Sequence, residues 1–340
     1  MKRAAKYARV AAALAAAAAP GTPSSLGAQP LERPIRPVHT YSIVARDAAT
    51  GQLGVAVQSH WFSVGSVVPW AESAVGAVAT QSFIDPGYGQ LGLDLMRVGK
   101  SAGEALAGLL AADPHPEVRQ VGMVDAAGRT AVHTGEQAIA EACQTTGEGF
   151  SVQANLMLRE TVCEAMVRAY IRTNGDLAER LMAALEAAEA EGGDIRGRQS
   201  AALLVVQGES TGRPWSDRIF DLRVEDHSEP LVELRRLLVV ARAYRHMNEG
   251  DERVTRGDID GAVEEYRAAE ALLPRESEPI FWHAVTLASV GEVDASLPLF
   301  ARAFDMRAEW RTLVPRLVDA GLLPANGGLV ERIVAAGRKR

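Results

Sequence analysis

Between residues 40 and 224, short apolar runs of β type recur and predict strands, and the run at 219–224 alternates between apolar and polar residues. Residues 41–45 and 53–59 are strand-like, and the intervening D-A-A-T-G, with Gly51 at the turn, predicts a hairpin. Further runs of β type span residues 64–68, 74–80, 120–124, 129–133, 150–158, 199–206 and 219–224. The run at 199–206 is almost continuously apolar, which is typical of a strand covered on both faces.

Apolar spacings of three and four residues predict two pairs of helices between these strands. The helices lie near residues 91–96, 105–110, 161–172 and 176–190. Ser101 with Glu104 predicts a capping box for the second helix, and Asp176 with Glu179 predicts the cap of the fourth. Strands and helix pairs in this order indicate an α+β fold of two packed sheets with helical layers outside.

After residue 226 the apolar period is helical throughout, so we expect a second, all-α domain over residues 228–340. One apolar stripe predicts a helix at 229–247. Its arginines fall largely off that stripe, and we expect a solvated face rather than a binding patch. They are Arg235, Arg236, Arg242 and Arg245.

An internal repeat follows this helix. Two segments align at an offset of 34 residues, with Gly257 on Gly291, Asp260 on Asp294, Tyr266 on Phe300 and Ala269 on Ala303. This is the tetratricopeptide period. Because two repeats bury little surface alone, we expect the helix at 229–247 and another near 310–317 to flank them.

Residues 1–28 have the features of a secretory signal peptide. Four basic residues precede an alanine-rich run from Val10 to Ala19, which is shorter than the roughly 20 apolar residues of a membrane-spanning helix. We expect cleavage after Ala28, a Pro-rich linker at residues 29–38, and export to the periplasm or the extracellular space. The alternative is a disordered basic N-terminus. No later segment is long and apolar enough to predict a membrane span.

The net charge and the cysteine content argue against some classes of partner and cofactor. The chain has 36 basic and 43 acidic side chains, and loss of residues 1–28 would move its net charge from −7 to −11, which argues against nucleic acid as a partner. Cys143 and Cys163 are the only cysteines and lack metal-ligand spacing. We expect two unpaired thiols, with a disulfide in an oxidising compartment as the alternative, and neither metal nor cofactor.

Thr40 stands at the head of the first predicted strand, in H-T-Y-S-I-V-A. A threonine hydroxyl is a weak nucleophile unless a base takes its proton, and the α-amine of the same residue is one such base. Only a cut between His39 and Thr40 frees that amine, and signal cleavage after Ala28 would leave eleven residues before Thr40. Two interpretations remain open: a processed catalytic threonine, or an ordinary strand residue.

Several motifs in this region occur in a recognisable order. They are H-T-Y-S-I-V-A-R-D, G-V-A-V-Q-S-H-W-F, V-G-A-V-A-T-Q-S-F-I-D-P-G-Y-G, R-Q-V-G-M-V-D, V-Q-A-N-L-M and G-R-Q-S-A-A-L-L-V-V. Together they resemble the domain of unknown function 1028 family, which is grouped with the N-terminal nucleophile (Ntn) hydrolases. The resemblance implies a four-layer αββα sandwich over residues 39–227, and family analogy favours a homo-oligomer.

In Ntn hydrolases the first mature residue attacks an amide carbonyl, and its α-amine carries the proton. Such an amine has a pKa of about 7.7–8.0, which suits a general base near neutral pH. Thr40 matches that position. The chain departs from Ntn enzymes that use a buried lysine beside the threonine, because its only lysines lie outside the predicted strands. They are Lys2, Lys6, Lys100 and Lys339.

Other candidate residues lie at the ends of predicted strands, where functional groups commonly sit. Ser59 and His60 could place a hydroxyl and an imidazole at a pocket rim, although a packed, hydrogen-bonded histidine is the commoner role. Gln81 and Asp85 end a strand and begin a turn, and Asp85 serves equally well as the cap of the next helix.

Three further polar residues are candidates on similar grounds. Asn155 interrupts the apolar V-Q-A-N-L-M segment and is either an oxyanion donor or a structural amide. Arg198 could bind a substrate carboxylate in bidentate fashion, although we favour its pairing with Asp194 to hold the loop. These are the last of the substrate-binding candidates.

The sequence predicts an exported Ntn-type amidohydrolase that acts on a small amide or peptide-like bond. Thr40 would be the nucleophile and Asn155 a donor to the oxyanion. The alternative is a catalytically silent exported scaffold whose residues 228–340 bind a protein partner, and association with the cell wall is a third option. Metalloprotease, α/β-hydrolase and nucleotide-binding motifs do not occur in the sequence.

Overall fold

The structure, a computed structural model, describes residues 40–337. The predicted signal peptide at 1–28 and linker at 29–38 lie outside these residues. The described part contains two antiparallel sheets and ten α-helices, several of which form a C-terminal helical region. The prediction of a mixed α and β fold followed by helices is therefore confirmed.

The larger sheet has six strands in the order β10-β9-β2-β1-β8-β7. Its strands are β1 (Thr40–Arg46), β2 (Leu53–Ser59), β7 (Cys143–Gly147), β8 (Phe150–Ala154), β9 (Ser200–Val206) and β10 (Arg218–Val224). β1 and β2 form the predicted hairpin, in which Gly51 has a φ of 72° that L-residues rarely adopt. β1 lies between β2 and β8, so Thr40 begins an interior strand.

The smaller sheet has four strands in the order β3-β4-β5-β6. They are β3 (Pro69–Glu72), β4 (Gly76–Ser82), β5 (Arg119–Asp125) and β6 (Thr130–Thr134). The predicted strand at 64–68 is wrong, because Val64–Ser66 form a 3-10 turn. Val64 is apolar because its side chain packs in the core between the two sheets.

The predicted strand at 150–158 is too long, and the edge strand β7 was not predicted. β8 ends at Ala154, and Leu156 has a φ of 56°, a left-handed conformation that a strand does not continue through. β7 is rich in exposed polar residues and has no apolar alternation from which it could be recognised.

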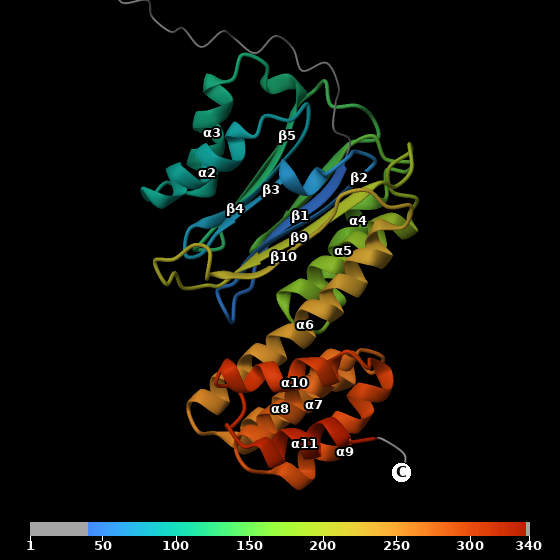
Figure 1. Ribbon diagram of the computed structural model, residues 1–340. Coiled ribbons are helices and arrows are strands. Elements are labelled where there is room, and N and C mark those ends of the chain that lie inside the picture. The colour runs from blue at the N-terminus through green and yellow to red at the C-terminus, as the bar shows by residue number, and fades with distance from the viewer. Residues whose placement is uncertain (1–39, 338–340) are drawn as a thin grey trace, which may run out of the picture. The chain divides into compact units, whose positions relative to one another are not determined.

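Three hydrophobic cores lie between the successive layers of sheets and helices. Val44, Val55 and Leu204 of the six-stranded sheet pack against Ala79 and Val124 of the four-stranded sheet. On its other face the smaller sheet packs against α2 (Gly87–Arg97) and α3 (Ala102–Ala112), and the larger sheet packs against α4 (Val162–Arg172) and α5 (Leu177–Ala190). Figure 1 shows these strands with a helix pair on either side. Both sheets are thus covered on both faces, which accounts for the full burial of β2 and β9 and of all but the last residue of β1.

The predicted helix caps are present. Ser101 and Glu104 form a capping box at α3, and the Asp176 side chain accepts a hydrogen bond from the Glu179 N–H at the start of α5. Such caps satisfy backbone N–H groups that have no partner within the helix.

The expectation of two unpaired thiols is wrong. Cys143 on β7 and Cys163 on α4 form a disulfide bond, with their Cα atoms 6.1 Å apart. The bond ties the edge strand of the larger sheet to the helix that covers that sheet. Sequence spacing could not reveal it, because the packing of α4 on the sheet brings the two residues together.

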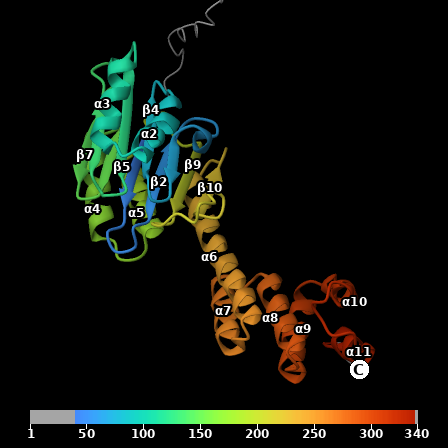
Figure 2. The same ribbon diagram turned by 90° about the vertical axis from the view of Figure 1, so that its left-hand side faces the viewer.

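Six helices follow β10. They are α6 (Pro230–Thr255), α7 (Ile259–Leu272), α8 (Ser277–Ser289), α9 (Val293–Met306), α10 (Trp310–Asp319) and α11 (Gly327–Ala335), and Figure 2 shows their succession. α7 and α9 begin 34 residues apart, and the aligned Tyr266 and Phe300 are both buried. α11 was not predicted. Within residues 40–337, no helix combines the length and hydrophobicity needed to cross a membrane.

α6 belongs to two cores at once. Leu234 and Leu238 lie in the core between the six-stranded sheet and its helices, whereas Met247 packs with Tyr266 of α7. The solvated arginine face predicted here is wrong for two residues. Arg235 forms ion pairs with Glu179 and Glu186 of α5, and Arg242 pairs with Asp176 and Glu179. These contacts connect α6 to α5.

Candidate functional site

Three hydroxyl side chains lie opposite one another at one end of the six-stranded sheet. In the strand register Thr40 is opposite Ser59, and Ser59 is opposite Ser200. All three are fully buried. Directly opposed residues on neighbouring strands share a face of the sheet, so the three hydroxyl groups form a row across β1, β2 and β9. Ser42, two residues after Thr40, lies on the same face and contacts the other sheet.

Gln81 of β4 joins the two sheets beside Thr40. Its Nε2 lies 3.1 Å from the Thr40 carbonyl oxygen, 2.6 Å from Gln120 Oε1 and 3.3 Å from the Gln153 carbonyl oxygen. Its Oε1 accepts a hydrogen bond of 2.6 Å from the Ser42 hydroxyl. Both ends of the amide are therefore engaged, and the side chain holds the start of β1 against the smaller sheet.

Asn155, which follows β8, also contacts the start of β1. Its backbone N–H donates to the Thr40 carbonyl oxygen at 3.1 Å, and its Nδ2 donates to Gln120 Oε1 at 2.8 Å. Gln120 Nε2 in turn donates to the Ala154 carbonyl and to the Thr134 hydroxyl, each at 2.9 Å. Gln120 thus accepts from the two candidate amides and sets the orientation of both.

A third amide extends this polar layer away from Thr40. Gln153 Nε2 donates to the Ser42 hydroxyl at 2.6 Å, and its Oε1 accepts from Ser151 at 2.9 Å. Gly122 faces this amide, and a Cβ there would lie 2.3 Å from Gln153 Oε1. Buried polar groups are stable only when they are hydrogen-bonded, so the layer requires glycine at this position.

Sequence reasoning placed Thr40, Ser59, Gln81 and Asn155 in the site, and the structure brings these four together. It missed Ser42, Gln120, Gln153 and Ser200, which complete the polar layer. A signal for some of them exists in the sequence. In V-Q-A-N the two amides are two residues apart, a spacing that places both side chains on the same side of an extended chain.

His60, Asp194 and Arg198 form a neighbouring group just past Ser59. The His60 backbone N–H donates to Asp194 Oδ2 at 3.1 Å, and His60 Nδ1 lies 3.3 Å from the Arg198 carbonyl oxygen. The expected pairing of Arg198 with Asp194 is wrong. Asp194 pairs with Arg196 at 2.7 Å, whereas Arg198 pairs with Glu189 and Glu229. Asp194 also accepts a hydrogen bond from the Arg196 backbone N–H. This contact keeps the Arg196 side chain close to the carboxylate, so Arg196 is its partner.

Tyr41 connects this second group to the start of β1. Its hydroxyl donates to Glu189 Oε2 at 2.6 Å. Burial of the ring, together with the neighbouring Glu189 carboxylate, raises the pKa of Tyr41 well above its usual 10.0. The phenol therefore stays protonated at any physiological pH and acts as a fixed hydrogen-bond donor.

Asp85 lies apart from these residues. Its carboxylate accepts a hydrogen bond of 2.8 Å from the Gly87 N–H, and its carbonyl accepts from the Thr80 hydroxyl at 3.2 Å. The first contact satisfies a donor at the start of α2, as a helix-capping side chain does. Among the described residues Asp85 makes no hydrogen bond to another candidate.

No group of three or more histidine, cysteine, aspartate or glutamate residues within 40–337 has the geometry of a metal site. The groups gathered around Thr40 are hydroxyls and amides, which donate and accept hydrogen bonds at fixed positions. In this arrangement the amides bond to one another and to the start of β1, which fixes the position of Thr40.

The chain is similar in sequence to one protein family and in structure to a solved protein. A solved structure, that of protein SPO2555 from Silicibacter pomeroyi, shares 27% sequence identity with it at a TM-score of 0.53, and the match covers 59% of this chain and 88% of that one. Its description names the same DUF1028 family. No curated protein matches the chain. Residues 40–234, more than half of the chain, match the family of unknown function DUF1028, and the protein therefore belongs to that family.

Proposed function

We propose that this protein is an exported Ntn-type amidohydrolase in which Thr40, freed by a cut after His39, is the nucleophile. The α-amine of Thr40 takes the hydroxyl proton while Oγ bonds to the carbonyl carbon of a small amide or peptide-like substrate. The C–N bond then breaks, and the leaving amine takes the proton. Water hydrolyses the resulting ester and restores the hydroxyl.

The position of Thr40 is the observation that carries the proposal. It is the first residue of an interior strand, and its carbonyl oxygen accepts hydrogen bonds from Gln81 Nε2 and the Asn155 N–H. These contacts hold the backbone of the residue in one orientation. Thr40 is fully buried in the uncut chain, so the proposed cut has to come before catalysis.

Neighbouring groups have roles in this scheme. Asn155 is assigned to the oxyanion, because Gln120 orients its side-chain amide beside Thr40. Ser59 and Gln81 border the nucleophile, and His60 with Asp194 forms the next contact along the sheet. Arg198 is the candidate for a substrate carboxylate, and it already binds the carboxylates of Glu189 and Glu229. Asp85 lies in the loop between β4 and α2, where it is the candidate for orienting the far end of the substrate.

Two features support the Ntn-type fold and the export of the protein. The order of helix pair, sheet, sheet and helix pair agrees with the αββα sandwich of the Ntn hydrolases. The disulfide between Cys143 and Cys163 supports export, because disulfides persist in oxidising compartments and are rare in the cytosol.

The test compares two forms of the full chain, one beginning at Gln29 and one beginning at Thr40. Each is treated with a β-lactone, whose strained ester acylates an activated hydroxyl and leaves the whole probe attached. Intact mass and peptide mapping then locate the added group. We expect labelling at Thr40 only in the form that begins there, because only that form has the α-amine as base.

Variants make the test specific. Thr40→Ala should abolish labelling, and Thr40→Ser should retain it. Thr130→Ala is the matched control, since Thr130 also begins a strand but belongs to the other sheet. Equal labelling of both forms would refute the role of the amine, and an unlabelled Thr40 form would refute the nucleophile. N-terminal sequencing of the exported protein then shows whether the cut after His39 occurs in the cell.

A second candidate function rests on the C-terminal helices. The 34-residue offset between α7 and α9, with Tyr266 and Phe300 buried at matching places, favours a tetratricopeptide-like scaffold that binds a protein partner. The test is removal of residues 257–340, which retains Leu234 and Leu238 in the sheet core. Loss of a cross-linked partner with an intact sandwich would support the scaffold, and unchanged cross-linking would refute it.

A further inference from the structure

A polar cavity of about 790 Å³ lies where α6 passes the end of β10. α6 contributes a stripe at spacings of three and four residues, so its members lie on one face of the helix. The stripe consists of Arg245, Asn248, Glu249 and Glu252. The opposite wall includes Gln207, Ser216 and residues 218–220. The arrangement supplies charged and neutral hydrogen-bonding groups around one open space.

This cavity is at the other end of the sheet from Thr40. Arg218 is opposite Val206, Val206 is opposite Leu53, and Leu53 is opposite Arg46 at the far end of β1. Strands of seven residues separate the two ends by about 20 Å, at roughly 3.3 Å per residue. The cavity therefore does not belong to the site proposed around Thr40.

Of the three arginines among the described residues that line the cavity, Arg245 is the one whose guanidinium forms no ion pair. Its guanidinium lies over the Phe220 ring, 5.3 Å from the centroid, and within residues 40–337 it forms no hydrogen bond or ion pair. Arg242 is held by Asp176, and Arg218 by Asp221. A guanidinium that rests on an aromatic ring is oriented in advance and presents its edge to a planar anion such as a carboxylate.

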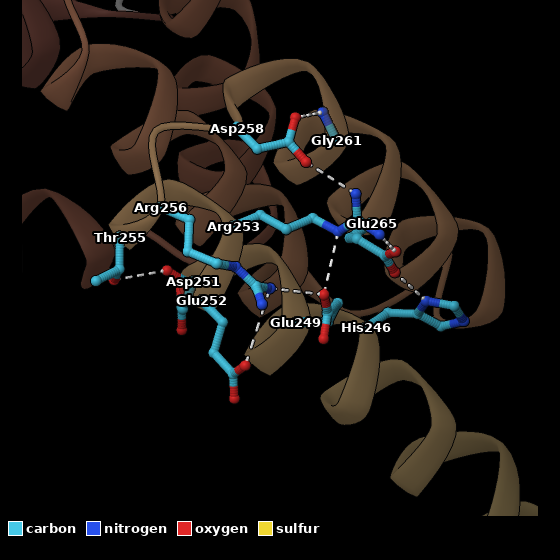
Figure 3. Close-up of polar contacts among 10 residues, drawn as sticks. All are labelled: His246, Glu249, Asp251, Glu252, Arg253, Thr255, Arg256, Asp258, Gly261 and Glu265. Carbon is cyan, nitrogen blue, oxygen red and sulfur yellow. Dashed lines mark hydrogen bonds and ion pairs between the residues drawn. The ribbon is translucent and has the colours of Figure 1, made fainter.

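The acidic groups of the cavity differ in how well they are neutralised. His246 and Arg253 bind Glu265, and Arg253 and Arg256 bind Glu249, as Figure 3 shows. Glu252 has only a distant contact with Arg256, at 3.9 Å, and that guanidinium is already 2.9 Å from Glu249. Glu252 is thus the acidic group of the cavity with most negative charge left over.

The charges of the lining favour a ligand that carries one charge of each sign. Three arginines face four carboxylates, those of Asp176, Glu249, Glu252 and Glu265. A dianion such as phosphate would be repelled by the carboxylates, whereas a zwitterion places its anionic end at Arg245 and its cationic end at Glu252. These residues are seven positions apart on α6, or about 10 Å at 1.5 Å per residue. An extended tripeptide spans about the same length.

We infer that this cavity binds a short zwitterionic peptide of about three residues, with its C-terminal carboxylate on Arg245 and its N-terminal ammonium at Glu252. Asn248 between them, with Gln207 and Ser216 across the cavity, supplies hydrogen-bonding groups for the peptide backbone. The site requires no processing at Thr40 and is independent of the proposed catalysis.

The test is isothermal titration calorimetry of the full chain with trialanine, its C-terminal amide, its N-acetyl form and inorganic phosphate. Trialanine should bind, and loss of either terminal charge should weaken binding about tenfold, as expected for one charge-assisted contact of about 1.4 kcal/mol. Arg245→Ala should weaken trialanine about tenfold or more. Glu252→Gln should remove the preference for trialanine over its acetylated form.

Two control variants check that trialanine binds in this cavity and not elsewhere on the chain. Arg236→Ala removes an exposed arginine of α6 that pairs with Glu233 and does not line the cavity, so binding should not change. Thr40→Ala should bind trialanine like the wild type, even if it abolishes labelling by the β-lactone. Failure of trialanine to bind at millimolar concentration, equal binding of phosphate, unchanged binding by Arg245→Ala or lost binding by Thr40→Ala would each overturn the inference.

Discussion

Replacement of Asp113 by asparagine should destabilise the sandwich strongly, because Asp113 neutralises a buried arginine. Arg119 at the start of β5 has a side chain only 7% exposed, and that of Asp113 is 4% exposed. The guanidinium Nε lies 2.6 Å from Asp113 Oδ2, and Nη1 donates to the Phe83 carbonyl at 2.5 Å. Tyr88 and the His115 N–H also donate to the same carboxylate.

The magnitude follows from the burial. Removing one partner of a buried ion pair leaves an uncompensated charge and costs about 3–5 kcal/mol. For a unit of 150–250 residues, each kcal/mol lowers the melting temperature by about 2–4 °C, so Asp113→Asn should lower it by about 6–20 °C. Asp94→Asn is the matched control, because Asp94 pairs with Arg97 at a surface where both side chains are more than 40% exposed. That change should cost about 1 kcal/mol or less.

The same pair predicts a pH dependence. Burial alone would raise the pKa of Asp113, but hydrogen bonds from Arg119, the His115 N–H and Tyr88 outweigh it and hold this pKa below its usual 3.8. A carboxyl group whose pKa is lower in the folded state stabilises fully above the unfolded value and loses this effect as the pH falls through the folded value. The difference in stability between wild type and Asp113→Asn should therefore shrink below about pH 4.

The assay is thermal and urea denaturation of wild type, Asp113→Asn and Asp94→Asn, followed by far-ultraviolet circular dichroism between pH 3 and pH 7. The double replacement Asp113→Leu with Arg119→Met should recover part of the loss, because no buried charge then remains. If Asp113→Asn costs no more than Asp94→Asn, or if its effect is the same at pH 3 and pH 7, the reasoning fails.

Three further outcomes are expected from other parts of the fold. Gly122→Ala should destabilise the sandwich by about 1–3 kcal/mol in urea denaturation, because its Cβ would displace the Gln153 amide; unchanged stability would show that Gln153 yields freely. Serine in place of both Cys143 and Cys163 should cost about 3 kcal/mol, from the loop entropy of their separation of 20 residues, and a reducing agent should lower the stability of wild type only. Tyr266→Ala should remove about 3–5 kcal/mol from the C-terminal helices, measured by hydrogen exchange, while exchange in β1 and β9 stays unchanged.

Much of the local structure could be predicted from sequence because it depends on neighbouring residues. The apolar runs of β1 and β2, the turn at Gly51 and the caps of α3 and α5 each follow from a few adjacent positions. The prediction failed where an apolar run had another cause. Val64 and Val68 are apolar because they pack in the core between the sheets, and a hydrophobic pattern cannot distinguish that from a strand.

The candidate site was predictable in part. Thr40 stood out by its place at a strand head, and Asn155 by its polarity in an apolar segment. Gln120 and Ser42 did not stand out, because their importance lies in what they contact. Gln120 engages Gln81, 39 residues away in sequence, and Ser42 engages Gln153, 111 residues away.

By itself, then, the sequence determined the order and type of most elements, the 34-residue offset of α7 and α9, and the position of Thr40 at the start of a strand. Tertiary structure alone decided the partners of the charged and polar side chains, including the disulfide, Arg196 rather than Arg198 at Asp194, and the isolated guanidinium of Arg245. The physical reason is the separation in sequence of the residues that interact. Secondary structure responds to periodicities of two and 3.6 residues, whereas a buried hydrogen bond or ion pair depends on which surfaces the packed layers bring within about 3 Å of each other.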